Sequence, residues 1–346
     1  MNELDLFDPG DNQVFHCVPK RTSPRIQSLG VRFPGRIHIT PIDCNRFNFG
    51  KPGGGGIGFA VELNNELHVR LADKDVVISE PIHQPLLHHY LILLKRLFLF
   101  DGSLEVRCQI SDPMRQHSGL GSSVAIATAF MQGVNVLFGC PLSYEEIRQL
   151  VAANFIEVCQ SRLARGLETG VGTYVILNGG FAIIADEIVP LYSTTMLNGL
   201  QVVLVQPKIQ RPETDRPESL DMLQRSLLLD SSYRYTRSYR IVMDIVPALN
   251  RRDLQSVGDI VWDFQFSGTH QSMIQAYEDG GIEIIKIMTL LRQVGGIIVG
   301  MSSVGPTIYA ICEDTTDIVG AVSEAKLSYC LTRVSSSGVQ TYGEKK

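Results

Sequence analysis

Apolar and polar residues alternate along several short segments in the first half of the chain, as they do in half-buried strands. This pattern predicts strands at 35–40, 58–63, 67–71, 104–110 and 181–188. Helical spacing of the apolar residues predicts helices at 85–100, 124–138 and 144–163. The last of these helices follows Ser143, with Glu146 three residues further on, which is the pattern of a capping box.

The pattern starts a second unit after residue 195. Its predicted strands are 201–205, 296–300 and 307–312, and its predicted helices are 218–228, 233–248, 253–266, 282–293 and 318–327. Strands and helices alternate without long helical crossovers, so we predict an α+β fold. We divide the chain into an N-terminal extension (1–30), an N-terminal α/β domain (31–195) and a C-terminal α+β domain (196–346).

Length and composition narrow the possible functions. With 346 residues the chain is long enough for two domains, and its net charge of −5 argues against nucleic acid or an anionic membrane as partner. Its apolar runs are too short to span a bilayer and residues 1–10 lack a signal-peptide core, so we expect a cytoplasmic protein. The seven cysteines include no Cys-x-x-Cys pair, which argues against a zinc site or a disulfide framework.

A turn rich in glycine and serine stands between the strand predicted at 104–110 and the helix predicted at 124–138. It reads His117-Ser118-Gly119-Leu120-Gly121-Ser122-Ser123. Glycines let the backbone approach a ligand closely, and the N–H groups at a helix N-terminus bind anions. The turn therefore predicts a phosphate site, although an ordinary capped helix start also fits it. Two further loops, 168–173 and 300–307, combine glycines with hydroxyl residues in a similar way.

Charged and titratable residues near these loops are the candidates for contacting a phosphorylated ligand. Arg36, Lys51, Lys208 and Arg211 could neutralise phosphate charge, or could be solvated surface residues. Asp43 and Glu168 could hold a metal ion, because hard cations take oxygen ligands, or could be ordinary loop carboxylates. His38 and His117 are candidates for acid–base roles, and His38 fits a buried pocket wall equally well.

The order of these motifs resembles the galactokinase, homoserine kinase, mevalonate kinase and phosphomevalonate kinase superfamily. Its signature, Pro-x-x-x-Gly-Leu-Gly-Ser-Ser, is matched at 119–123, with Pro113 displaced by two residues. The resemblance implies a two-domain GHMP-kinase-like fold. Kinases of this superfamily commonly carry a catalytic aspartate in a Ser-Gly-x-Asp loop, where this chain has Thr169-Gly170-Val171-Gly172. Phosphoryl transfer would then lack its base.

A non-kinase branch of the superfamily has a loop of this kind, without the aspartate. The chain also resembles that branch, the β-ribofuranosylaminobenzene 5′-phosphate synthases. The shared motifs stand here as Arg36-Ile37-His38-Ile39-Thr40, Gly55-Gly56-Ile57-Gly58, the loop 169–173 with Gly179-Gly180-Phe181, and 302–307. Those enzymes condense phosphoribosyl pyrophosphate with 4-aminobenzoate and release pyrophosphate and carbon dioxide. Relatives in C-nucleoside pathways use a heteroaromatic carboxylate. The chain departs from the pattern at 51–53, 123–125 and Val304, which leaves the aromatic acid open.

The resemblance implies a decarboxylating C-glycosyltransferase that uses Mg²⁺, acts on two small molecules and forms a homodimer. The residues then expected to bind substrate are Arg36, Thr40, Lys51, Gly119, Leu120, Gly121, Ser122, Ser123, Thr169, Gly170, Val171, Gly172, Thr173, Lys208, Arg211, Ser302, Ser303 and Gly305. Those expected to act in catalysis are His38, His117, Asp43 and Glu168, the last two as metal ligands. An ATP-dependent kinase with its base elsewhere and a catalytically silent binding subunit are the alternatives.

Overall fold

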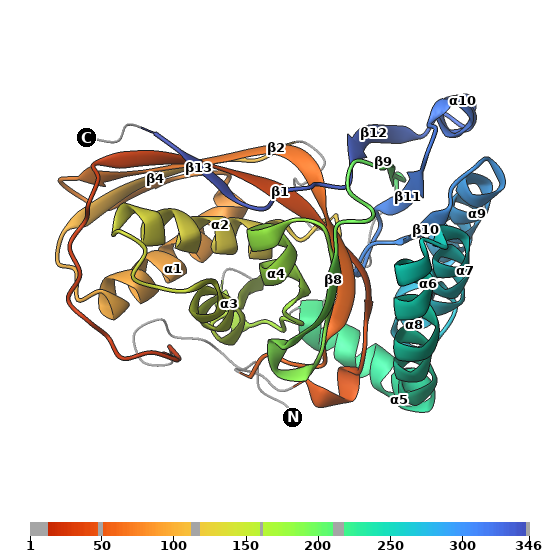
Figure 1. Ribbon diagram of the computed structural model, residues 1–346, viewed down its shortest axis with the longest axis horizontal. Coiled ribbons are helices and arrows are strands. Elements are labelled where there is room, and N and C mark those ends of the chain that lie inside the picture. Colours follow the sequence, from red (N-terminus) through yellow and green to blue (C-terminus); the bar gives the residue numbers. More distant parts are fainter. Residues whose placement is uncertain (1–12, 48–50, 112–117, 160–161, 210–217, 344–346) are drawn as a thin grey trace.

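The computed structural model describes residues 13–47, 51–111, 118–159, 162–209 and 218–343. The molecule has two main sheets that lie side by side, and each is covered by helices (Figure 1). The predicted α+β class is confirmed by this arrangement. No helix in the described ranges is long and apolar enough to cross a membrane.

The larger sheet has seven strands and is built around one long hairpin. Its strands are β1 (Ser28–Pro41), β2 (Gly56–Ala72), β3 (Val76–Ile78), β4 (Ser103–Gln109), β7 (Phe181–Ile184), β8 (Pro190–Thr194) and β13 (Gln340–Tyr342). The order is β13-β1-β2-β4-β3, with β7 paired to β2 and β8 to β7. The last strand of the chain thus returns to the first sheet, and β1 begins within the predicted extension, at Ser28.

The strands predicted separately at 58–63 and 67–71 are one continuous strand, β2. Polar residues separate the two predicted strands, but Asn65 among them is buried and bonded through its side-chain amide. It donates to the carbonyl of Phe33 over 3.2 Å, beside a register shift in β1, and accepts from the backbone of Ser111 over 3.0 Å. A polar side chain that satisfies an irregularity in the neighbouring strand therefore lies inside β2, where the sequence predicted a break between two strands.

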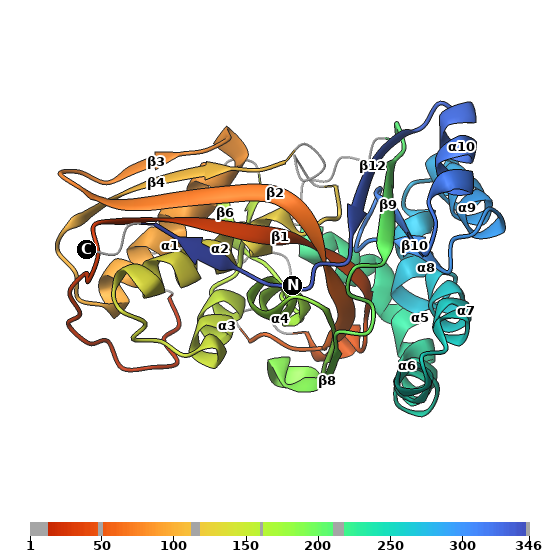
Figure 2. The same cartoon turned by 45° about the horizontal axis from the view of Figure 1, so that its top comes forward.

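Four helices pack beneath this sheet, with one of them in the centre (Figure 2). They are α1 (Gln84–Leu97), α2 (Ser122–Leu137), α3 (Tyr144–Ala153) and α4 (Val171–Asn178). α2 contacts β1 and β2 as well as the other three helices, and it is buried almost throughout. An apolar helix enclosed in this way holds its N-terminus in a fixed position relative to β1.

The helix predicted at 144–163 ends at Ala153, and a short hairpin of β5 (Ile156–Cys159) and β6 (Arg162–Arg165) follows it. The predicted capping box at Ser143 and Glu146 is present. Asn154 ends the helix because its side chain bonds both backbone groups of Val14 over 2.8 Å. That contact joins residues far apart in the sequence, so local periodicity could not predict it.

The smaller sheet is antiparallel, in the order β10-β11-β9-β12. Its strands are β9 (Gln201–Gln206), β10 (Ile298–Met301), β11 (Ile308–Cys312) and β12 (Ser328–Arg333). The helices beside it are α5 (Glu218–Arg240), α6 (Val246–Arg251), α7 (Leu254–Gln265), α8 (Gly268–Gln275), α9 (Asp279–Gln293) and α10 (Thr316–Glu324). The two sheets share apolar core, because the ring of Phe59 on β2 meets that of Tyr309 on β11 with centroids 5.6 Å apart.

The helices predicted at 218–228 and 233–248 are one helix, which runs through α5 and a π-helical segment (Ile241–Ile245) into α6. The sequence Asp230-Ser231-Ser232 suggested a break, but the Asp230 carboxylate is fully buried and forms an ion pair with Arg237. Arg237 also donates to the carbonyl of Ile42 over 2.9 Å. The buried pair therefore holds α5 against the segment that follows β1.

Replacing Arg237 by methionine is expected to destabilise the protein by about 3–5 kcal/mol, because it leaves the buried Asp230 carboxylate without its counter-charge. Urea unfolding would measure this loss. Arg240→Met removes a guanidinium of the same helix that is 25% exposed, and is expected to cost less than about 1 kcal/mol. Equal losses in the two variants would contradict the role given to the buried pair.

Candidate functional site

The glycine-rich turn leads directly into the N-terminus of α2. Gly119 and Gly121 have φ values of 81° and 67°, a region that glycine adopts without strain, and Gly121 is the N-cap of the 16-residue helix. Within the described residues no side chain caps this end of the helix. The first N–H groups of α2 are therefore available to an anion, and the helix dipole favours negative charge there.

Arg36 on β1 lies directly against this turn. A Cβ added at Gly121 would come within 2.7 Å of the Arg36 Nε atom, so a larger residue there would have to displace the guanidinium. The Arg36 backbone N–H also donates to the Leu120 carbonyl over 3.2 Å. The Arg36 side chain is buried, and it places a permanent positive charge beside the α2 N-terminus. The two features together favour negative charge at this end of α2.

The loop between β10 and β11 holds the glycine turn from the other side. The Ser302 hydroxyl donates to the Gly119 carbonyl over 2.7 Å and accepts from the His38 backbone N–H over 3.2 Å. Ser303 N–H donates to the His38 carbonyl over 2.9 Å, and Thr307 N–H donates to the Ser118 carbonyl over 3.3 Å. Three of the predicted segments, which lie far apart in the sequence, are thus joined through hydrogen bonds. We call the place where β1 at His38, the glycine turn and the β10–β11 loop meet the junction.

His38 connects this junction to the fourth predicted segment. Its Nε2 atom lies 3.2 Å from the Thr169 hydroxyl. Burial lowers the pKa of His38 well below the usual range, and the neighbouring charges of Arg36 and His270 lower it further. The imidazole is therefore neutral at pH 7, and it can orient the Thr169 loop by a hydrogen bond.

Glu168 occupies the N-terminus of α4. Its Oε1 atom accepts from the N–H groups of Gly170 and Gly172 over 3.0 and 3.2 Å. Burial raises the pKa of Glu168, while Arg36 and these amides act in the opposite direction. The two glycine loops therefore differ: the α2 N-terminus is open to a ligand, whereas the α4 N-terminus already holds a carboxylate of its own chain.

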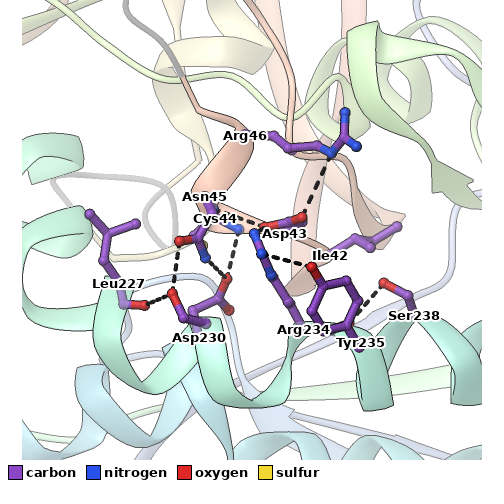
Figure 3. Close-up of polar contacts among 12 residues, drawn as sticks. Ile42, Asp43, Cys44, Asn45, Arg46, Leu227, Asp230, Arg234, Tyr235 and Ser238 are labelled. Carbon is purple, nitrogen blue, oxygen red and sulfur yellow. Dashed lines mark hydrogen bonds and ion pairs between the residues drawn. The ribbon is translucent and has the colours of Figure 1, made fainter.

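Asp43 lies in a separate polar network at the 3₁₀ turn after β1 (Cys44–Arg46), shown in Figure 3. Its Oδ1 atom accepts from Asn45 N–H over 3.0 Å and lies 3.4 Å from the Arg234 guanidinium. Asp230 on the same face of α5 accepts from Cys44 N–H over 2.8 Å. The helix α5 thus carries the turn that holds Asp43.

The two predicted metal ligands do not fit a preformed protein cage. Asp43 contacts Asn45 and Arg234, and Glu168 contacts two amides of its own loop. Across the described ranges, no group of three or more His, Cys, Asp and Glu side chains is gathered for a metal ion. Mg²⁺ stays a prediction.

The remaining predicted residues lie in different places. Leu120, Val171 and Thr173 are buried, Thr40 donates to the Pro41 carbonyl, and Gly305 N–H donates to the Ser302 carbonyl. Lys51 is exposed and paired with Glu187 over 2.8 Å, and Lys208 is exposed at the end of β9. Ser122 and Ser123 form the first turn of α2. His117 and Arg211 lie outside the described residues.

Residues 88–167 match the family of GHMP kinases N terminal domains. This stretch runs from α1 to the hairpin after α3 and includes the open N-terminus of α2. This part of the chain is thus a GHMP kinase N-terminal domain.

Two curated relatives of this chain are named β-ribofuranosylphenol 5′-phosphate synthases. The one from Archaeoglobus fulgidus is 25% identical over 306 residues, which cover 82% of this chain and 88% of the relative. The one from Methanothermobacter thermautotrophicus is 25% identical over 325 residues, covering 86% and 92%. The solved homoserine kinase of Cytophaga hutchinsonii, 16% identical, matches with a TM-score of 0.65 over 92% of this chain and 99% of its own. The predicted GHMP-like fold and the resemblance to the ribofuranosyl synthases are confirmed.

The sequence did not predict the residues that α5 brings to the turn after β1 or the one that α8 brings near His38. Asp230, Arg234 and Arg237 are spaced by four and three residues, so they share one face of a helix. That spacing was the available signal, but the predicted break at 228–233 concealed it. His270 on α8 is buried, and no motif marked it.

Gly119→Ala is expected to destabilise the protein more than Gly199→Ala, although both glycines have a φ of 81°. A Cβ at Gly119 would lie 2.3 Å from the Ser302 carbonyl oxygen, whereas a Cβ at Gly199 meets nothing within 4 Å. The control should therefore lose only the backbone strain, about 1–2 kcal/mol. Urea unfolding of both variants measures the difference. Similar losses would argue against close contact between the two loops.

The stability of the protein is expected to fall as the pH drops below about 6.5, the pKa of an unfolded histidine. Burial, with the nearby charge of Arg237, lowers the pKa of His270 to about 4, so the unfolded state takes up a proton that the folded state excludes. His270→Gln should therefore flatten the slope of unfolding free energy by about 1 kcal/mol per pH unit between pH 5 and 6. Chemical unfolding at several pH values measures it. An unchanged slope would mean that His270 titrates alike in both states.

Proposed function

We propose that this protein joins the anomeric carbon of phosphoribosyl pyrophosphate to an aromatic carboxylic acid, with loss of pyrophosphate and carbon dioxide. The main support is the likeness, over more than four fifths of the chain, to two relatives named as β-ribofuranosylphenol 5′-phosphate synthases. The open α2 N-terminus with Arg36 beside it supports the same proposal, because the donor carries a 5′-phosphate and a diphosphate.

The names of these relatives guide the choice of acceptor. A ribofuranosylphenol is the product expected when a hydroxybenzoate loses its carboxyl group, so we propose 4-hydroxybenzoate as the first acceptor to test. 4-Aminobenzoate, expected from the sequence motifs, is the second, and a pyrazole-type carboxylate of C-nucleoside synthesis is the third. All three are electron-rich aromatic acids.

The proposed reaction forms one carbon–carbon bond and breaks two bonds. The C–O bond to pyrophosphate breaks with its electron pair on the leaving group, which leaves oxocarbenium character at the anomeric carbon. The ring carbon that bears the carboxylate attacks this centre. The electron pair of the ring–carboxylate bond then restores aromaticity as carbon dioxide departs. The acceptor loses carbon dioxide where other acceptors would lose a proton, so this step needs no general base.

Residues of the junction have distinct roles in this proposal. The N–H groups at the start of α2 and the Arg36 guanidinium bind donor phosphate, which stabilises the negative charge that grows on the leaving group. The neutral His38 orients the Thr169 loop. Ser302 and Glu168 hold the two glycine loops in place, because their polar atoms are already used by the protein. The chain mostly positions two reactants.

Phosphoribosyl pyrophosphate at a hundredfold excess over its dissociation constant is expected to stabilise the protein by about 2.7 kcal/mol. Arg36→Met should remove most of this stabilisation, while Arg32→Met, an exposed change on the same strand, should keep it. Thermal unfolding with the donor or with ATP, each with and without Mg²⁺, measures binding. Release of labelled carbon dioxide from each carboxyl-labelled acid measures turnover.

The outcomes separate the proposal from its alternatives. Stabilisation by the donor with carbon dioxide release supports the synthase. Stabilisation by ATP alone would overturn it in favour of a small-molecule kinase that takes its base from elsewhere. Binding of the donor without turnover of any of the three acids would favour a catalytically silent binding subunit.

A further inference from the structure

The turn between β7 and β8 has a backbone conformation that most residues avoid. Glu187 and Ile188 both have a φ of 54°, in the left-handed region that favours glycine. Ile188 is β-branched and fully buried, and its carbonyl accepts a hydrogen bond from the buried Arg148 of α3. Backbone strain of this kind persists where the surroundings fix it, and it is concentrated at functional sites. Arg148 and the core around Ile188 therefore fix this turn, and with it the position of Asp186.

Asp186, the first residue of the turn, bonds the glycine loop that precedes β2. Its Oδ1 atom accepts from the Gly54 N–H over 2.9 Å, and its Oδ2 atom accepts from the Arg46 guanidinium over 2.8 Å. Burial alone would raise the pKa of Asp186, but these hydrogen bonds lower the pKa below its ordinary value, so the side chain is a carboxylate at pH 7. A Cβ added at Gly53 would lie 2.6 Å from Oδ1, so the loop and the carboxylate are in close contact.

The loop that Asp186 holds also packs against the candidate site. The N–H of Gly53 donates to the Glu168 carbonyl over 3.3 Å. A Cβ added at Gly56 would lie 2.7 Å from the His38 Nε2 atom, so the backbone there lies directly against the imidazole. A shift of this loop is therefore transmitted to His38 and Glu168, which hold the neighbouring glycine loop.

We propose that Asp186 is a positioning residue for the proposed reaction, and that its hydrogen bond from the Gly54 N–H keeps the neighbouring loop, 168–173, in its reactive arrangement. This role rests on the proposed function. The described hydrogen bonds of the Asp186 side chain come from Gly54 and Arg46, not from Arg36 or the start of α2, where the donor phosphates bind. Asp186 therefore acts on the rate of turnover and not on the binding of the donor.

The hydrogen bond from Gly54 matters more than the ion pair with Arg46. The Arg46 and Asp186 side chains are 62% and 34% exposed, and Arg46 also lies 3.7 Å from the Asp43 carboxylate (Figure 3). An exposed ion pair contributes little, whereas a buried N–H that loses its acceptor is costly. Gly54 is buried. Because an amide keeps an acceptor oxygen, Asp186→Asn separates the two contacts.

Turnover of the full chain, measured as carbon dioxide release from the accepted carboxyl-labelled acid, tests this role. Asp186→Ala is expected to lower kcat by about tenfold to a hundredfold, because a small displacement far from the reacting atoms has effects of this size. The rise in unfolding temperature caused by the donor should stay as in the wild type, which separates this role from a loss of folding. Asp186→Asn should keep most of the turnover. Glu187→Ala, the matched control, removes a carboxylate of the same turn that is 64% exposed and pairs with Lys51, and should leave kcat unchanged.

Amide hydrogen exchange at Gly54 tests the contact without using activity. The Gly54 N–H should exchange faster in Asp186→Ala than in the wild type or Asp186→Asn, whereas amides in the core of β2 should exchange alike in all three. Unchanged exchange at Gly54 in Asp186→Ala, or a wild-type kcat in that variant, would overturn this role alone. A wild type that turns over none of the acids would overturn the proposed function, and this role with it.

Discussion

The buried hydroxyl of Ser302 is the atom on which the rest of the junction depends. It donates to the Gly119 carbonyl and accepts from the His38 backbone, so it joins the loop of the smaller sheet to both the glycine turn and β1. Such a group must be satisfied when it is buried, and here only segments from both sheets together satisfy it. The position of the glycine turn is therefore a property of the whole chain, set by contacts that a fragment would not contain.

Electrostatics distinguishes two loops that look alike in the sequence. Both place glycine at the N-cap of a buried helix with φ in the left-handed region, Gly121 for α2 and Gly170 for α4. The α2 end faces the Arg36 guanidinium, so positive charge and helix dipole reinforce each other there. The α4 end faces the Glu168 carboxylate, which offsets its dipole. A phosphate ligand is therefore favoured at one end and disfavoured at the other.

Sequence reasoning predicted the elements and loops that depend on local signals. The glycine turn, the capping box at Ser143 and most strands follow from residue type and spacing, and the structure contains them. The errors share one physical cause. Asn65 and Asp230 are polar residues that usually mark breaks, and Asn154 lies inside a predicted helix, but each is buried and bonded to a segment far along the chain. Only the folded structure supplies those partners, so local patterns placed turns or helix ends incorrectly.

The same limit applies to the candidate site. Motifs identified the segments around His38, Gly119, Thr169 and Ser302, and hydrogen bonds do connect them. Motifs could not separate side chains that face a ligand from those that hold the loops, because that difference lies in which partners satisfy each polar atom. Kinases of this superfamily commonly use a carboxylate that accepts a proton, and the Glu168 carboxylate beside the loop is already bonded to two amides. A reaction that releases carbon dioxide from its acceptor needs no such base, so the arrangement of this loop is compatible with the proposed chemistry.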